Sequence, residues 1–161
     1  MSDSFRRLDV DQYDEDALRP EELVAVDPKS PDAAMAAAQQ KQPTVRARVA
    51  SGDIAGALQV VLEDVPYGAP NDAARRTTLA LLLEILNATR VADIPGALRP
   101  LDVLQRDTLM KYLYKGLQLG ATESGAAHGV NCAVLLSWHE KLTQAAGTGC
   151  IVRVMSDRRE L

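Results

Sequence analysis

Apolar residues recur every three or four positions along most of this chain, which is the spacing of one face of an α-helix. The first such segment begins at Ser30-Pro31, an N-cap residue followed by proline at the first helical position. Pro43 is expected to end or kink this helix, because proline lacks an amide hydrogen and collides with the preceding turn. A second helix is then expected over residues 44–51.

Asp53 is placed to cap the next helix, which carries an apolar stripe on one side. The stripe consists of Ile54, Ala57, Leu58, Val61 and Leu62. Residues 64–70 are expected to form a loop, and Asn71 opens a helix whose central sequence, TLALLLEIL, is apolar on nearly every side. A helix without a polar face must be surrounded by other helices, so this one is expected at the centre of the protein.

A short helix is expected at residues 93–98, followed by a longer one at 102–118. At about 100° per residue, the large apolar side chains of the longer helix share one face. These are Leu109, Met110, Leu113, Tyr114 and Leu117. Tyr112 falls outside this stripe on the opposite face, so it is predicted to be exposed, either incidentally or as part of a partner-contact surface.

The Gly-rich residues 119–129 are expected to form a flexible loop, and residues 130–146 a helix that ends at Gly147. The final segment contains Ile-Val-x-Val, which is strand-like by propensity, but a single strand would have no partner, so a short terminal helix is expected. The pattern therefore predicts an all-α body at residues 30–161: about six to seven helices in antiparallel pairs around the central one.

Residues 1–29 are predicted to be an extended N-terminal arm. Its first sixteen residues follow neither a helical nor a strand period, and they are too acidic to bury much apolar surface, so we expect them to be mobile when free. One interpretation is a solubilising acidic leader. The other is a peptide that folds onto a partner through apolar, aromatic and arginine anchors. The candidate partner-binding residues are Phe5, Arg6, Arg7, Leu8, Val10 and Tyr13, together with Tyr112 in the body.

Charge is unevenly distributed along the chain. Residues 1–32 hold ten acidic and four basic residues, a net of −6, whereas residues 33–161 hold twelve acidic and fourteen basic residues, a net of +2. The nearly neutral body has no basic stripe of the kind that binds nucleic-acid phosphates, so no nucleic acid is expected as a partner. No run approaches the roughly 18 apolar residues of a membrane span. A charged start and only two cysteines predict a soluble intracellular protein.

His128, Cys132 and His139 are the one constellation that suggests a metal, since imidazole and thiolate are preferred zinc ligands. Gly129 argues against a helix that includes His128. Cys132 and His139 would lie two helical turns apart, about 10.5 Å, which is too far for both to bind one ion. We therefore expect packing or capping roles for these residues and no metal.

The sequence shows no sign of nucleophilic or phosphate chemistry. Cys132 and Cys150 lie in apolar sequence, which would raise a thiol pKa, and GxSxG, GxxxxGK[ST] and HExxH are absent. Carboxylates spread along a mobile arm cannot hold a catalytic geometry. Trp138 is expected to be a core or interface anchor. We therefore expect no catalytic residue, no cofactor and no enzyme activity.

Three segments carry a pattern typical of one family: FRRLDVDQYDED at 5–16, LMKYLYKGLQ at 109–118 and LLSWHEKLTQAAGTGCIVRVMSDRR at 135–159. In these segments the chain resembles subunit 5 of the actin-related protein 2/3 complex, the smallest subunit of that actin nucleator. The resemblance covers nearly the whole length, with weaker agreement at 51–67 and Ala92–Ile94. Residues 17–50 and 119–129 differ freely, and nothing is carried over there.

The resemblance implies a compact α-α superhelix with an extended N-terminal arm. It also implies that the body docks on subunit 4 and touches subunit 1, a β-propeller, while the arm reaches and tethers actin-related protein 2. Members support nucleation of branched filaments in the cytoplasm, at the actin cytoskeleton, and their link to the filament is indirect. They have no catalytic activity, since nucleotide binds the actin-related subunits.

Two hypotheses from different classes follow. The first is a structural subunit of the nucleator. The second is a free-standing helical adaptor or small enzyme that uses the C-terminal helix. Copurification separates them, because a subunit fractionates with its partners and an adaptor as a small monomer.

Overall fold

The computed structural model describes residues 29–122, 129–159 and 161. Within these residues the chain forms seven α-helices, two short 3-10 helices and no strand, so the all-α prediction is confirmed. The elements in chain order are α1 (Pro31–Ala50), α2 (Ile54–Leu62), η4 (Ala69–Asn71), α3 (Asp72–Ala88), η5 (Val91–Asp93), α4 (Ile94–Leu98), α5 (Val103–Gly120), α6 (Cys132–Ala146) and α7 (Gly149–Ser156). None of these helices is long and apolar enough to cross a membrane.

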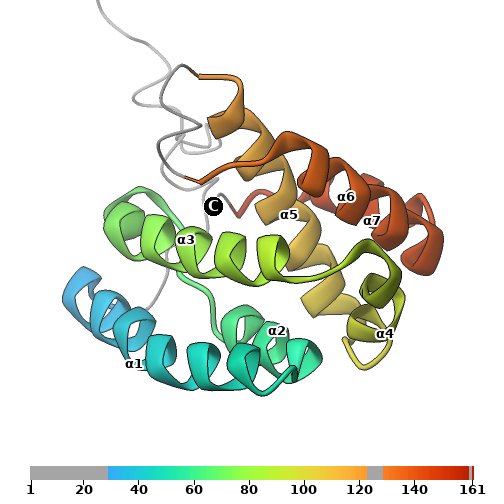
Figure 1. Cartoon of the computed structure of the whole chain (residues 1–161). Helices are drawn as coiled ribbons and strands as arrows, with labels where there is room; N and C mark the ends of the chain where they lie inside the picture. The colour runs from blue at the N-terminus through green and yellow to red at the C-terminus, as the bar shows by residue number, and fades with distance from the viewer. Residues whose placement is uncertain (1–28, 123–128, 160) are drawn as a thin grey trace, which may run out of the picture.

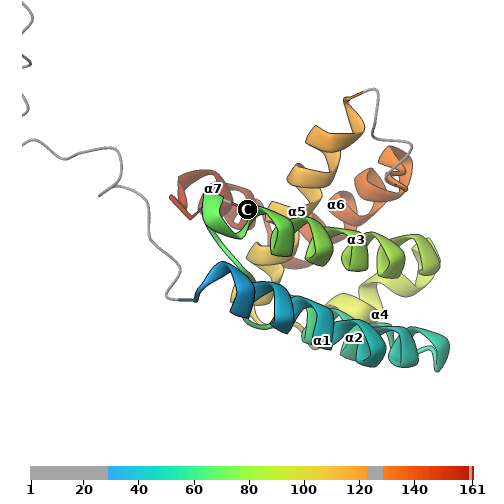
Figure 2. The same cartoon turned by 90° about the vertical axis from the view of Figure 1, so that its left-hand side faces the viewer.

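The helices are arranged around α3 (Figure 1). The pair α1 and α2 lies on one side of α3, and α5 with α6 lies on the other, as the perpendicular view in Figure 2 also shows. The helix α7 packs against α5. Eight side chains of α3 are buried, including Leu82, Ile85 and Leu86, so the prediction that this helix occupies the centre is confirmed.

The helix α1 runs unbroken through Pro43, so the prediction that it ends there is wrong. Pro43 is exposed, and the Gln39 carbonyl that it leaves without a helical partner can be hydrated by solvent. Packing on both sides of the proline holds the helix together. Ala34 and Ala38 lie against α3 before it, and Val45 enters the main core after it.

The two caps that the sequence predicts, at Ser30 and Asp53, are confirmed, and a third cap lies at the start of α5. Ser30 Oγ accepts from the Ala33 amide, and Asp53 Oδ1 accepts from the Gly56 amide at 2.9 Å. Asp102 and Gln105 form a reciprocal capping box at the start of α5. These bonds satisfy amides that have no partner within their own helix.

Trp138 belongs to the core. Its side chain is fully buried, and its indole Nε1 donates to the Leu86 carbonyl at 3.3 Å. The bond joins α6 to the end of α3 and satisfies the only polar atom of a large buried ring. Trp138 was expected to be either a core or an interface anchor, and the structure shows that it is a core residue.

Candidate interaction surfaces

Most of the candidate partner-binding residues lie outside the part of the chain that the structure describes. These are Phe5, Arg6, Arg7, Leu8, Val10 and Tyr13. His128 and much of the predicted loop at 119–129 also lie outside it, whereas the start of that loop belongs to α5, which continues to Gly120. The surfaces described below therefore come from the helical body.

Tyr112 is only 1% exposed, so the prediction that its side chain is exposed is wrong. The wheel argument considered one buried face, but α5 contacts α6, α7 and α3, so more than one face is covered. Burial, with the nearby Tyr67, raises the pKa of the Tyr112 phenol far above its ordinary value. Its hydroxyl makes no hydrogen bond of normal geometry to a described residue, although the Thr78 hydroxyl lies nearby.

A polar cluster fastens the C-terminal segment onto α5. Lys111 Nζ lies 2.7 Å from Asp157 Oδ2 and donates to the Arg159 carbonyl at 2.8 Å, while Arg159 Nη2 lies 3.0 Å from the same Asp157 oxygen. The Tyr67 ring lies under both cations, 5.4 Å from Lys111 Nζ and 5.0 Å from Arg159 Cζ, at cation–π distance. We call Tyr67, Lys111, Asp157 and Arg159 the C-terminal clasp.

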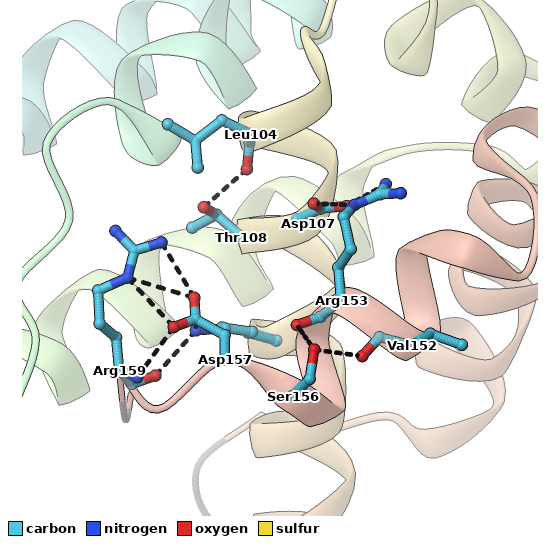
Figure 3. Close-up of polar contacts among 9 residues, drawn as sticks. Leu104, Asp107, Thr108, Val152, Arg153, Ser156, Asp157 and Arg159 are labelled. Carbon is cyan, nitrogen blue, oxygen red and sulfur yellow. Dashed lines mark hydrogen bonds and ion pairs between the residues drawn. The ribbon is translucent and has the colours of Figure 1, made fainter. Parts of the chain in front are cut away.

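The electrostatics of the clasp favour the ionised carboxylate. Partial burial of Asp157 opposes ionisation, but hydrogen bonds from Arg159 and Lys111 outweigh it and hold the pKa of Asp157 well below its usual range. Nearby, Arg153 of α7 binds Asp107 of α5 through two hydrogen bonds of 2.6 and 2.8 Å (Figure 3). Paired charges therefore join α5 to α7 and to the segment after it.

Beside these pairs, α5 and α7 expose large apolar side chains. More than half of the surface of Val103, Leu104, Val152 and Met155 is open to solvent. Figure 3 shows Leu104 and Val152 on the two helices that the Arg153–Asp107 pair connects. Exposed apolar groups on packed helices are typical of a surface that another protein covers.

Sequence reasoning missed these four residues, because it assigned apolar positions in a helix to the core. The positions of two of these residues in the sequence could have indicated their exposure. Val103 and Leu104 occupy the first turn of their helix and fall outside the apolar stripe that runs through Leu109 and Leu113.

A second surface is a groove of about 470 Å³ between α3 and α5. Its floor is apolar, with Leu79 and Leu83 from α3 and Leu119 from α5, and Tyr112 and Leu161 also line it. Its charged groups include Arg75, Arg76 and Lys115. The groove thus combines an apolar floor with a basic edge.

Most of the side chains that could take part in chemistry are engaged in hydrogen bonds or buried in the core. The Tyr114 hydroxyl and His139 Nε2 lie 3.1 Å apart in a hydrogen bond. Cys150 is fully buried, and burial, followed by the neighbouring Asp107, raises the pKa of its thiol to about 12. Cys132 is exposed, contrary to the apolar surroundings expected for it. Among the described residues, no three His, Cys, Asp or Glu side chains are grouped to hold a metal ion.

Comparison with known proteins gives consistent matches over nearly the whole chain. Residues 4–161 match the family model described as ARP2/3 complex 16 kDa subunit (p16-Arc). The chain is 35% identical to actin-related protein 2/3 complex subunit 5-C of Xenopus laevis, covering 99% of this chain and 95% of that one. It is 36% identical to actin-related protein 2/3 complex subunit 5 of Saccharomyces cerevisiae, covering 99% of each, and 32% identical to the human subunit 5-like protein, covering 99% and 95%.

Proposed function

The chain belongs to the family of ARP2/3 complex 16 kDa subunits, and from this premise we propose that it is a non-catalytic structural subunit of the actin-related protein 2/3 complex. The observation that carries the proposal is the extent of the match, which runs from residue 4 to residue 161. The matched residues include most of the predicted N-terminal arm and all of the helical body.

The body is the part that docks on neighbouring subunits. By its resemblance to the family, it contacts subunit 4 and subunit 1. The exposed apolar side chains of α5 and α7 support this role, because Val152 and Met155 are 64% and 80% exposed and grouped apolar side chains on a surface often mark a protein interaction site. We place a docking surface of the body there.

The arm, residues 1–29, is the part that tethers actin-related protein 2. Its anchors are Phe5, Arg6, Arg7, Leu8, Val10 and Tyr13. Aromatic and arginine side chains supply most of the energy in many interfaces, which makes a short segment of this composition an effective tether. The assembled complex supports nucleation of branched actin filaments in the cytoplasm, and the chain reaches the filament only indirectly.

A pull-down of the tagged chain from its own cells, followed by mass spectrometry, tests the assignment. A subunit brings down the two actin-related proteins and the other subunits in constant proportion. A chain that elutes as a small monomer without them is the free-standing helical adaptor or small enzyme of the second hypothesis. That result would overturn the proposal.

A pair of variants tests the docking surface separately. The double substitution Val152→Asp with Met155→Asp places two charges on the exposed apolar face of α7 and is expected to lose the other subunits in the pull-down. The matched control, Ala36→Asp with Ala47→Asp, adds the same charge to exposed positions of α1 and is expected to retain them. Equal recovery from both variants would show that α7 is not a docking surface.

A further inference from the structure

The groove between α3 and α5 lies on the side of α3 opposite to α1. Ala74 and Glu84 face α1, where Ala74 packs on Ala38 and Glu84 binds Arg46. At about 100° per residue, Leu79 and Leu83, which line the groove, project from the other side of the helix. The floor of the groove is therefore an apolar surface that α1 does not cover.

The charged groups of the groove leave it cationic. Arg75 and Arg76 both bind Asp72, at 3.1 and 2.7 Å, so these three side chains carry a net charge of +1. Lys115 adds a second positive charge. An acidic segment with an apolar or aromatic side chain is the complement of such a surface.

The chain itself contains a segment of that composition. Residues 9–16, DVDQYDED, hold five carboxylates and no basic residue, with Val10 and Tyr13 among them. We propose that in the free subunit residues 9–16 dock in the groove of the same chain, with Tyr13 against Leu79 and Leu83 and the carboxylates against the basic edge.

The length of the chain permits this contact. Twelve residues lie between Asp16 and Lys29, and the thirteen steps along the chain can span about 43 Å when extended. Lys29, which lies just before α1, pairs with Asp64. Ala34, in the first turn of α1, packs in the same small cluster as Ala74 of α3. The segment therefore has to pass around one helix, which is about 10–12 Å across.

A tethered segment needs little intrinsic affinity. A short flexible connection gives an effective concentration on the order of millimolar, so a groove of about millimolar affinity would be occupied about half of the time. A docked arm is unavailable to any other protein. The groove would thus hold the arm against the body until a partner binds it more tightly.

Paramagnetic broadening in the full-length isolated chain tests the proposal. Cys132 is exposed beside Gly120, next to Leu119 of the groove, whereas Cys150 is fully buried with a raised thiol pKa. A thiol-reactive nitroxide at neutral pH therefore labels Cys132. Amide signals of residues 9–16 are expected to lose at least half of their intensity relative to a diamagnetic label, and to lose more than residues 19–26, which lie nearer to α1 in the sequence.

Charge reversal supplies the decisive comparison. Arg76→Glu with Lys115→Glu changes two exposed side chains of the groove and is expected to restore the signals of residues 9–16. Arg90→Glu with Arg99→Glu makes the same charge change at exposed positions beyond the other end of α3 and is expected to leave the broadening intact. Sodium chloride at about 1 M, where charges are screened beyond about 3 Å, should act like the first variant.

Two results would overturn the proposal. One is broadening that is equal in the wild-type chain and in both charge-reversed variants, which would mean that the arm passes near the label without using the groove. The other is broadening that appears only when a labelled chain is mixed with an isotopically enriched unlabelled chain, which would place the arm on a second copy. Neither result bears on assembly with other subunits, which the pull-down measures.

Discussion

The Lys111 ammonium group lies 2.7 Å from the Asp157 carboxylate, although 46 residues separate them in the chain. Only 9% of the Lys111 side chain and 26% of the Asp157 side chain are exposed. A charge pair withdrawn from water to this degree leaves a costly unpaired charge when one partner is removed. The Lys111–Asp157 pair therefore holds the last segment of the chain to α5, and its contribution to stability can be measured by substitution.

Asp157→Asn is expected to lower the free energy of unfolding by about 1–3 kcal/mol, because the largely buried Lys111 loses its counter-charge. Urea unfolding followed by circular dichroism measures the change. Glu140→Gln is the matched control, since Glu140 is 62% exposed and its nearest lysine contact is 3.6 Å long. The control is expected to change stability by less than about 0.5 kcal/mol. Equal effects from the two substitutions would contradict the role of the clasp.

The contribution of Asp157 should depend on pH in one direction. Its pKa is lower in the folded protein than in the unfolded chain, so the stabilisation is complete above the unfolded value of about 4 and is lost as the pH falls. The difference in unfolding free energy between wild type and Asp157→Asn should be constant from about pH 5 to 7 and shrink below about pH 4. A difference that grows in acid would contradict this assignment.

Leu86→Asp is expected to unfold the body. Leu86 is 1% exposed in the central helix, and an unpaired carboxylate there costs several kcal/mol against a total stability of about 5–15 kcal/mol. Leu83→Asp should act in the same way. Ala80→Asp, at an exposed position of the same helix, is the control and should retain a cooperative thermal transition. A transition within a few degrees of wild type in Leu86→Asp would show that α3 is not central.

Helix positions were predictable here because their signals are local. Ser30, Asp53 and Asp102 each cap a helix through an amide three residues away, and Gly147 ends α6 with a φ of +75°. These contacts depend only on nearby residues, so a reader of the sequence can find them.

The failures of prediction arose where distant elements decide the outcome. Pro43 is compatible with a helix only because Ala34, Ala38 and Val45 pack on either side of it. Tyr112 is buried because α3 covers a second face of α5. The C-terminal clasp joins Tyr67 to Lys111, 44 positions apart, and Lys111 to Asp157, 46 positions apart, and no local pattern indicates such contacts.

Pro43→Ala is expected to stabilise the protein. Alanine restores the amide of a continuous helix and removes the clash with the preceding turn, which raises the free energy of unfolding by up to about 3 kcal/mol. The unfolded chain becomes more flexible without proline, and this lowers the gain by about 0.4–1 kcal/mol. Thermal melting should show the increase. Ala47→Pro, at an exposed position one turn later, is the reciprocal control and should destabilise. A lower melting temperature for Pro43→Ala would mean that the proline itself is needed for packing.

Deletion of residues 1–28 is expected to leave a complex that assembles and nucleates more slowly. Every core residue that the structure describes lies beyond residue 28, so the body should fold. Loss of two or three good anchors removes roughly 2–6 kcal/mol of local affinity for actin-related protein 2, partly masked by tethering through other subunits. Pyrene-actin assembly with matched complexes measures the effect, and Phe5→Ala with Tyr13→Ala should reproduce much of it. If complexes that contain the deleted chain nucleate at the wild-type rate, the arm is only a solubilising leader.

The buried position of Trp138 gives this protein an internal optical probe. It is the only tryptophan in the sequence, and its indole is enclosed where α6 meets the end of α3. Its fluorescence should therefore be that of an apolar environment and should shift to longer wavelength when α6 separates from α3. Events confined to the arm or to the groove should leave the emission unchanged. The intrinsic emission can thus distinguish opening of the body from rearrangement of the arm without any added label.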